Sequence, residues 1–149
     1  MYGHDIDETT SPVEAGLSWS VAKSRRNGGA KAGGFIGADI ILPQLDSIVS
    51  YDQSSGGHVL PLRRRVGFVS EARAPIREGA KIVVERDGQV EIGAVTSGGF
   101  SPSLQRPILM AYVDNIEAAK REKCFALVRD KLQPLQNVSM PFVPHSYKR

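Results

Sequence analysis

Acidic side chains cluster near the start of the chain, where Asp5, Asp7 and Glu8 stand close together. Hard cations such as Ca²⁺ bind clustered carboxylate oxygens, so this segment is a candidate metal site. The spacing lacks the remaining ligands of a calcium-binding loop, and a solvated acidic loop is the favoured alternative. We therefore assign no metal ligand to these residues.

The histidines and the single cysteine offer no second candidate for metal binding or nucleophilic chemistry. His4, His58 and His145 are scattered, without the i, i+4 pair of a zinc protease helix. Cys124 lies in an alternating apolar run, where a small buried thiol is expected. A single cysteine also excludes an intramolecular disulfide.

Basic residues gather at Arg63–Arg65 and at Lys23, Arg25 and Arg26, where an acidic protein surface or, less favourably, a nucleic acid could bind. The net charge of +3 is weak support, because 19 basic and 16 acidic residues are mixed along the chain. A nucleic-acid-binding barrel would interleave aromatic residues with Lys and Arg on one sheet face, and the sequence shows no such pattern. We predict a solvated strand start at Arg63–Arg65 and no nucleic acid partner.

Length and composition favour one principal globular domain, with 149 residues, 41% of them hydrophobic and 23% charged. No apolar run approaches the ~20 residues that span a bilayer, so we predict no membrane insertion. The acidic first residues resemble neither a secretory signal nor a transit peptide, so the chain shows no targeting signal.

The first part of the chain contains one strand pattern and one helix pattern. Leu17–Ala22 alternates like a strand, and the apolar residues of 35–45 predict a short helix that ends close to Pro43. A polar stretch with the pair Gly56-Gly57 follows and has the composition of a linker. We predict a partial α/β remnant of a middle domain over residues 1–46 and a polar linker over residues 47–60.

Short β-branched runs between turn signals predict a mainly β domain over residues 61–149. The expected strands are Arg65–Ser70, Ala80–Glu85, Val90–Thr96, Ile108–Val113, Lys123–Arg129 and Leu132–Met140. Asp87-Gly88 predicts a hairpin turn within residues 80–96, the glycine-rich Thr96–Leu104 a loop, and Ile116–Arg121 one or two helical turns. About six strands remove their edges by closing into a Greek-key or jelly-roll-like barrel.

Five segments, in the same order, resemble motifs of the glycine cleavage T-proteins, which are aminomethyltransferases. The segments are Tyr2–Trp19, Gly34–Ala38, Arg64–Gly67, Thr96–Leu104 and Met140–Pro144. The resemblance is to the C-terminal portion of that family and covers the chain apart from an insertion at Ile48–Leu62.

The resemblance implies one-carbon chemistry. Family members have three domains around a folate pocket, and transfer an aminomethyl group from the lipoyl arm of H-protein to tetrahydrofolate, releasing ammonia. It therefore implies tetrahydrofolate as cofactor and lipoylated H-protein as partner. The family's catalytic aspartate corresponds to a position before Met1, so we expect no catalytic residue here and no turnover by this chain alone. The expected location is the mitochondrial matrix for a eukaryotic source, which is favoured, and the cytoplasm for a bacterial one.

The resemblance also implies five candidate folate contacts. The aromatic rings of Tyr2 and Trp19 could pack on the flat pterin, with core packing as the alternative. Glu14 could accept hydrogen bonds from the pterin or orient an arginine, and otherwise would be a solvated charge at a strand end. Tyr147 and Arg149 could reach the glutamyl part of the folate, unless the terminus is frayed.

A different class of function stays open for this sequence. The chain could be a non-catalytic barrel module that binds H-protein or another protein. An exposed apolar surface around Leu17 and Trp19 would support that function.

Overall fold

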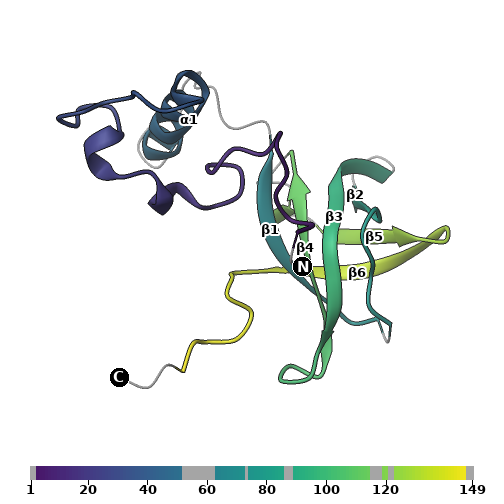
Figure 1. Cartoon of the computed structure of the whole chain (residues 1–149). Coiled ribbons are helices and arrows are strands. Elements are labelled where there is room, and N and C mark those ends of the chain that lie inside the picture. Colours follow the sequence, from purple (N-terminus) through teal and green to yellow (C-terminus); the bar gives the residue numbers. More distant parts are fainter. Residues whose placement is uncertain are drawn as a thin grey trace. The chain divides into compact units, whose positions relative to one another are not determined.

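The computed structural model describes residues 3–51, 63–72, 74–85, 89–114, 119–120 and 123–146, except for the side chains of residues 48–51 and 89. The described residues belong to two compact units (Figure 1). Residues 6–64 make up the N-terminal unit. The barrel unit consists of residues 65–149 together with the first five residues of the chain.

Six strands form the barrel unit (Figure 1). They are β1 (Arg64–Ser70), β2 (Lys81–Glu85), β3 (Gln89–Ser101), β4 (Arg106–Val113), β5 (Cys124–Val128) and β6 (Lys131–Val138). The sheet closes in the order β1-β4-β3-β2-β5-β6, and β6 pairs antiparallel with β1. Because β1 lies beside β4 while β2, β3 and β4 follow one another, the topology is a Greek key. The predicted closed barrel of six strands is confirmed.

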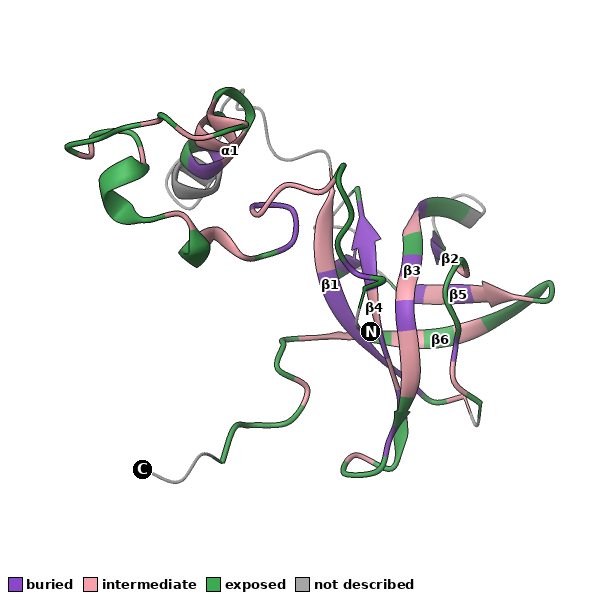
Figure 2. Cartoon of the chain, viewed as in Figure 1, coloured by how far each residue is buried: buried purple, intermediate pink, exposed green. Residues whose placement is uncertain are grey.

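The core of the barrel unit is built from the inward side chains of all its strands, and Figure 2 shows buried residues concentrated on β1 and β4. The strands contribute, in chain order, Phe68, Ile82, Val95, Leu109, Ala126 and the partly buried Leu135. Each large apolar side chain that leaves water contributes roughly 1.5–3 kcal/mol to folding. Cys124 belongs to the same core, so the predicted buried thiol is confirmed.

The predicted hairpin is confirmed, since β2 and β3 pair antiparallel from Lys81 to Glu85. The turn residues Asp87-Gly88 lie outside the described residues, and Ile116–Arg121 is described only at two helical positions. The predicted loop Thr96–Leu104 is wrong in its first part, because β3 continues to Ser101. The reason is that the glycines there continue the ladder with β4 rather than turn the chain.

In its described residues the N-terminal unit contains two short 3-10 helices and one α-helix: η1 (Ser18–Ser20), η2 (Lys23–Arg25) and α1 (Ala38–Tyr51). The predicted strand over Leu17–Ala22 is therefore wrong. Its backbone groups bond locally, because the Arg26 guanidinium donates from Nη2 to the Ser18 carbonyl at 2.6 Å and from Nε to the Val21 carbonyl at 3.0 Å. Local side-chain bonds of this kind replace those of a neighbouring strand.

Helix α1 continues past Pro43, where the sequence predicted its end. An interior proline removes one backbone hydrogen bond and costs about 3 kcal/mol. Contacts beyond it offset this cost: Leu45 is buried, the Ser11 hydroxyl donates to Gln44 Oε1 at 2.6 Å, and Asn27 donates to Asp46 at 2.6 Å. The first residues of the predicted linker are consequently helical, while residues 52–60 lie outside the described part. The domain boundaries stay a prediction.

Candidate functional site

Glu14 closes a reciprocal hydrogen-bonded turn with Ser11. The Ser11 backbone N–H donates to Glu14 Oε2 at 2.8 Å, and the Glu14 backbone N–H donates to the Ser11 hydroxyl at 3.1 Å. This is the capping box of a Ser-x-x-Glu segment, which satisfies two otherwise unpaired backbone donors. Glu14 is only 7% exposed, so the alternative of a solvated strand-end charge is wrong.

The Arg63 guanidinium contacts three residues of the acidic segment in the N-terminal unit. Its Nε lies 3.6 Å from Glu14 Oε1, and its Nη2 donates to the hydroxyls of Thr9 and Thr10 at 3.2 Å each. The Arg63 side chain is 32% exposed and tied to these partners, so the predicted solvated strand start does not describe it. Contact with an arginine was one of the roles expected of Glu14, and its ion pair with Arg63 is such a contact.

Replacing Glu14 with alanine removes the capping carboxylate and the partner of Arg63. We expect the local free energy of unfolding of residues 11–17 to fall by about 1–2 kcal/mol. Hydrogen exchange of the backbone amides in that turn measures the effect. Glu8 is an exposed acid in the same segment, so Glu8→Ala is the matched control, expected to stay within about 0.5 kcal/mol of the parent. Equal losses in the two variants would contradict the capping role.

Asp7 organises a second turn in the same segment. Its Oδ1 accepts hydrogen bonds from the Thr9 hydroxyl at 2.7 Å, the Thr10 hydroxyl at 2.8 Å and the Thr9 backbone N–H at 2.9 Å. The Thr9 hydroxyl, then the Thr10 hydroxyl and the Thr9 N–H, hold the pKa of Asp7 below its ordinary value, with a smaller contribution from the charge of Arg63.

The lowered pKa of Asp7 predicts how the turn responds to acid. Because the pKa is lower in the folded chain than in the unfolded one, the turn is stabilised above the ordinary aspartate pKa, and this stabilisation disappears as the pH falls through the lowered pKa. Titration of the Asp7 carboxyl carbon by NMR measures the pKa directly. The double substitution Thr9→Val and Thr10→Val should raise it toward the ordinary value. Ser103→Ala, at an exposed position of the barrel unit, should leave it unchanged.

Asp5 belongs to the same acidic motif but has a different environment, because it is buried in the barrel unit. Its carboxylate accepts hydrogen bonds from the hydroxyls of Thr96 and Ser97, so the predicted solvated acidic loop is wrong at this residue. Among the described residues, no group of His, Cys, Asp and Glu is arranged to hold a metal ion.

The structure describes two of the five candidate folate contacts, both in the N-terminal unit. Trp19 is 77% exposed, so it is not a core residue of this chain, whereas Glu14 is buried. Tyr2, Tyr147 and Arg149 lie outside the described residues. The role of all five candidates in folate binding stays a prediction.

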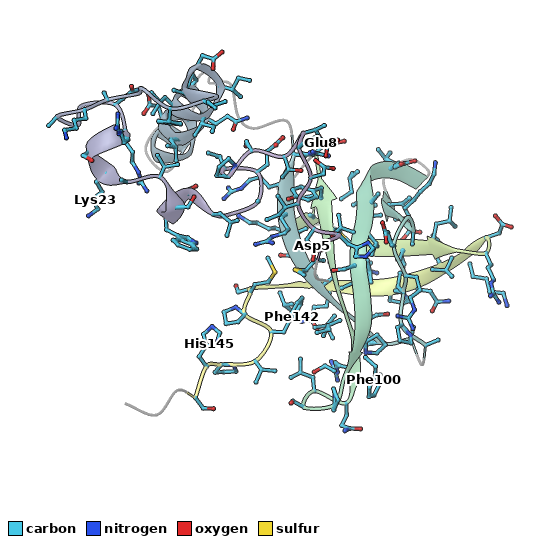
Figure 3. All side chains as sticks on the ribbon, viewed as in Figure 1. Asp5, Glu8, Lys23, Phe100, Phe142 and His145 are labelled. Atoms are coloured by element: carbon cyan, nitrogen blue, oxygen red, sulfur yellow. The ribbon has the colours of Figure 1, made fainter. Side chains whose placement is uncertain are left out.

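The basic residues of the N-terminal unit mostly hold its backbone. Arg26 bonds two carbonyls of the η1 region, and Arg25 donates to the Gly33 carbonyl at 3.1 Å. Lys23 is exposed and labelled in Figure 3. Arg25 and Arg26 therefore stabilise the backbone of the N-terminal unit, whether or not they also bind an acidic surface.

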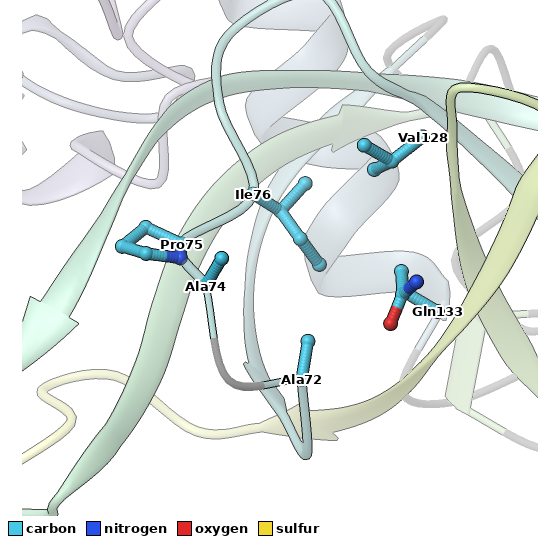
Figure 4. Close-up of a pocket in the computed structure, with 6 residues that line it drawn as sticks. All are labelled: Ala72, Ala74, Pro75, Ile76, Val128 and Gln133. Atoms are coloured by element: carbon cyan, nitrogen blue, oxygen red, sulfur yellow. The ribbon is translucent and has the colours of Figure 1, made fainter.

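Two depressions on the barrel unit contain none of the candidate residues. The first has a volume of about 270 Å³, and Figure 4 shows its lining: Ala72, Ala74, Pro75, Ile76, Val128 and Gln133. Among the described lining residues, Gln133 is the one with a polar side chain. The second, of about 410 Å³, includes Glu71, Phe100 and Arg106. None of these three was singled out from the sequence as a ligand contact.

Sequence reasoning missed the contacts of Ser11, Arg63 and Asp5. A Ser-x-x-Glu pattern is a known sign of a capping box, so the Ser11–Glu14 pair was readable from the sequence. The partners of Asp5 are 91 and 92 positions away along the chain, and no local signal indicates them.

Among the helices that the structure describes, none is long and apolar enough to cross a membrane.

The fold defines a closed Greek-key barrel domain, preceded by a helical unit whose acidic segment is held by capping bonds. The model of the glycine cleavage T-protein C-terminal barrel domain matches residues 63–144. The chain belongs to this family and corresponds to the C-terminal portion of a T-protein, as its motifs predicted.

Relatives resemble the chain along nearly its whole length. The probable mitochondrial aminomethyltransferase of Schizosaccharomyces pombe is 46% identical over 149 residues, which are 99% of this chain and 33% of that protein. The mitochondrial aminomethyltransferase of Mus musculus is 42% identical over 147 residues, 99% of this chain and 32% of its own. The crystal structure of the glycine cleavage system aminomethyltransferase T from Bartonella henselae has a TM-score of 0.69 at 38% identity, covering 95% of this chain and 34% of that one. The chain thus spans about a third of the length of these relatives.

Proposed function

We propose that this chain contributes the C-terminal barrel and the segment before it to a tetrahydrofolate-dependent aminomethyl transfer of the glycine cleavage system. In this reaction the aminomethyl carbon passes from the lipoyl arm of H-protein to tetrahydrofolate, and ammonia is released. The match of residues 63–144 to the T-protein barrel carries the proposal, and the identity of 46% to an aminomethyltransferase supports it. The names of the relatives support a location in the mitochondrial matrix.

Trp19 is the described candidate that is available to a flat ligand. Its indole is largely exposed, and an aromatic face packs well on a pterin ring. Glu14 would act indirectly, because Ser11 already bonds one carboxylate oxygen and Arg63 lies next to the other. Tyr2, Tyr147 and Arg149 remain proposed folate contacts on the resemblance alone.

Calorimetric titration of the chain with tetrahydrofolate tests the proposal. We expect saturable binding, and a loss of roughly two- to twelvefold in affinity for Trp19→Ala, since an aromatic contact contributes about 0.5–1.5 kcal/mol. Trp19→Phe should retain most of the affinity. Phe100→Ala removes an exposed ring from the barrel unit and serves as the control. The proposed folate role fails if the parent chain does not bind tetrahydrofolate, or if the control variant loses as much affinity as Trp19→Ala.

The exposure of Trp19 beside the half-buried Leu17 also favours the second function, a non-catalytic module that binds H-protein or another protein. Titration with lipoylated H-protein separates the two functions. A module of this kind would bind H-protein without binding tetrahydrofolate. A chain that takes part in the transfer would bind both.

A further inference from the structure

Three hydroxyl groups of the barrel unit form hydrogen bonds with one residue near the start of the chain, Asp5. The Thr96 and Ser97 hydroxyls donate to Asp5 Oδ1 at 2.6 Å and 2.7 Å, and the Tyr112 hydroxyl donates to the main-chain carbonyl of Asp5 at 2.8 Å. Asp5, Ser97 and Tyr112 are each at most 7% exposed. Figure 3 labels Asp5 where it lies against the strands of the barrel. We call Thr96, Ser97 and Tyr112 the hydroxyl socket.

A bulge in β3 makes this arrangement possible. Neighbouring residues of a regular strand point to opposite faces, so adjacent hydroxyls do not normally reach the same atom. The pairing of β3 with β4 shifts register between Val95 and Ser97, and a bulge redirects a side chain at such a point. Thr96 also lies 3.2 Å from the Met110 carbonyl, but its shorter bond is to the carboxylate.

The chemistry of the hydroxyl socket is selective. It provides three hydroxyl donors and no positive charge. Two of the hydroxyls donate to a side-chain oxygen of the bound residue, and the third donates to the main-chain oxygen of the same residue. Hydrogen bonds to an ionised acceptor are roughly twice as strong as neutral ones. An asparagine would present a neutral oxygen to the same two donors, so the carboxylate of an aspartate is the stronger acceptor.

We propose that the hydroxyl socket is a recognition site for an aspartyl peptide, and that the chain's own Gly3–Asp5 segment is its resident occupant. The segment belongs to the barrel unit although residues 6–64 separate it from the strands that hold it. The occupant is therefore tethered rather than part of the sheet. A peptide of the same sequence on another molecule can replace it. The inference concerns the barrel alone and does not depend on the proposed folate chemistry.

Substitution of Asp5 by alanine in the full chain removes the carboxylate from the Thr96 and Ser97 hydroxyls and so frees them for a binding test. The probe is a fluorescent peptide with the sequence of residues 1–8, made with aspartate or asparagine at its fifth position, and its anisotropy is followed. We expect saturable binding of the aspartate peptide to the Asp5→Ala chain, and binding about tenfold or more weaker for the asparagine peptide. Adding Thr96→Val and Ser97→Ala to that chain should abolish binding.

The matched control is Asp7→Ala, which removes an exposed acid two positions away and leaves the hydroxyl socket filled. Its chain should bind the aspartate peptide at least about tenfold more weakly than the Asp5→Ala chain does. Equal binding of the two peptides, or equal binding by the two chains, would overturn the proposal. If Asp5→Ala fails to fold, Tyr112→Phe decides the matter. Loss of its one hydroxyl should speed hydrogen exchange of residues 3–6 about three- to tenfold, and unchanged exchange would count against the proposal.

Discussion

Replacing Phe68 with alanine is expected to lower the free energy of unfolding of the barrel unit by about 3–5 kcal/mol. Phe68 lies on β1, is fully buried and is among the largest side chains in the core. Its removal loses the free energy gained when the ring is transferred from water to the core, and it leaves a cavity in a closely packed barrel. Denaturant unfolding, followed by far-UV circular dichroism, measures the shift in midpoint.

Phe100→Ala is the matched control for this change. Phe100 has the same side chain in the same sheet, but it is 47% exposed at the end of β3. Its loss should cost about 1 kcal/mol or less, because little buried surface is removed. Similar midpoints for the two variants would mean that Phe68 does not occupy the core as described.

Adding a single methyl group at Gly98 is expected to lower the free energy of unfolding by about 3 kcal/mol. A Cβ built on Gly98 would overlap the backbone carbonyl oxygen of Ile76, which lies against β3 at this point. A backbone atom held by the buried Ile76 side chain cannot move aside as a flexible side chain can. Thermal or denaturant unfolding of Gly98→Ala measures the loss.

Gly67→Ala provides a graded comparison, since Gly67 also lies in a strand against a close neighbour. Its added Cβ would meet side-chain atoms instead, Met140 Cγ at 2.9 Å and Phe142 Cζ at 3.0 Å. These side chains can shift, so we expect a loss of about 1 kcal/mol. If Gly67→Ala were the more destabilising of the two, the close approach of Ile76 to β3 would be contradicted.

The barrel was predictable because its strands carry strong local signals. Short runs of β-branched residues alternate with turn residues, and all six expected strands are present, with shifts of one or two residues at their ends except at β3, which continues to Ser101. The N-terminal unit was not predictable in the same way. Leu17–Ala22 alternates like a strand, yet Arg26 bonds its carbonyls. Pro43 predicted a helix end, yet tertiary contacts of Leu45 and its neighbours hold the helix together beyond it.

The candidate site likewise has contacts that were predictable from the sequence and contacts that were not. The Ser11–Glu14 bonds connect residues three positions apart, so the pattern was open to local reasoning. The environment of Asp5 depends on a β-bulge and on residues far along the chain, which sequence spacing does not encode. At Trp19 the local signal was misleading. Its apolar character favoured a core position, but the side chain is largely exposed in the structure.

The register of β1 against β6 has a consequence for how the barrel is made during synthesis. Gly67 pairs with Val138 and Ser70 with Leu135, so the first and last strands must meet before the cylinder is complete. Hydrogen bonds between such distant positions form slowly, since the long loop between them loses entropy first. A newly made chain in which β6 has not yet paired therefore presents β1 and β5 as unpaired edges, open to association with other chains.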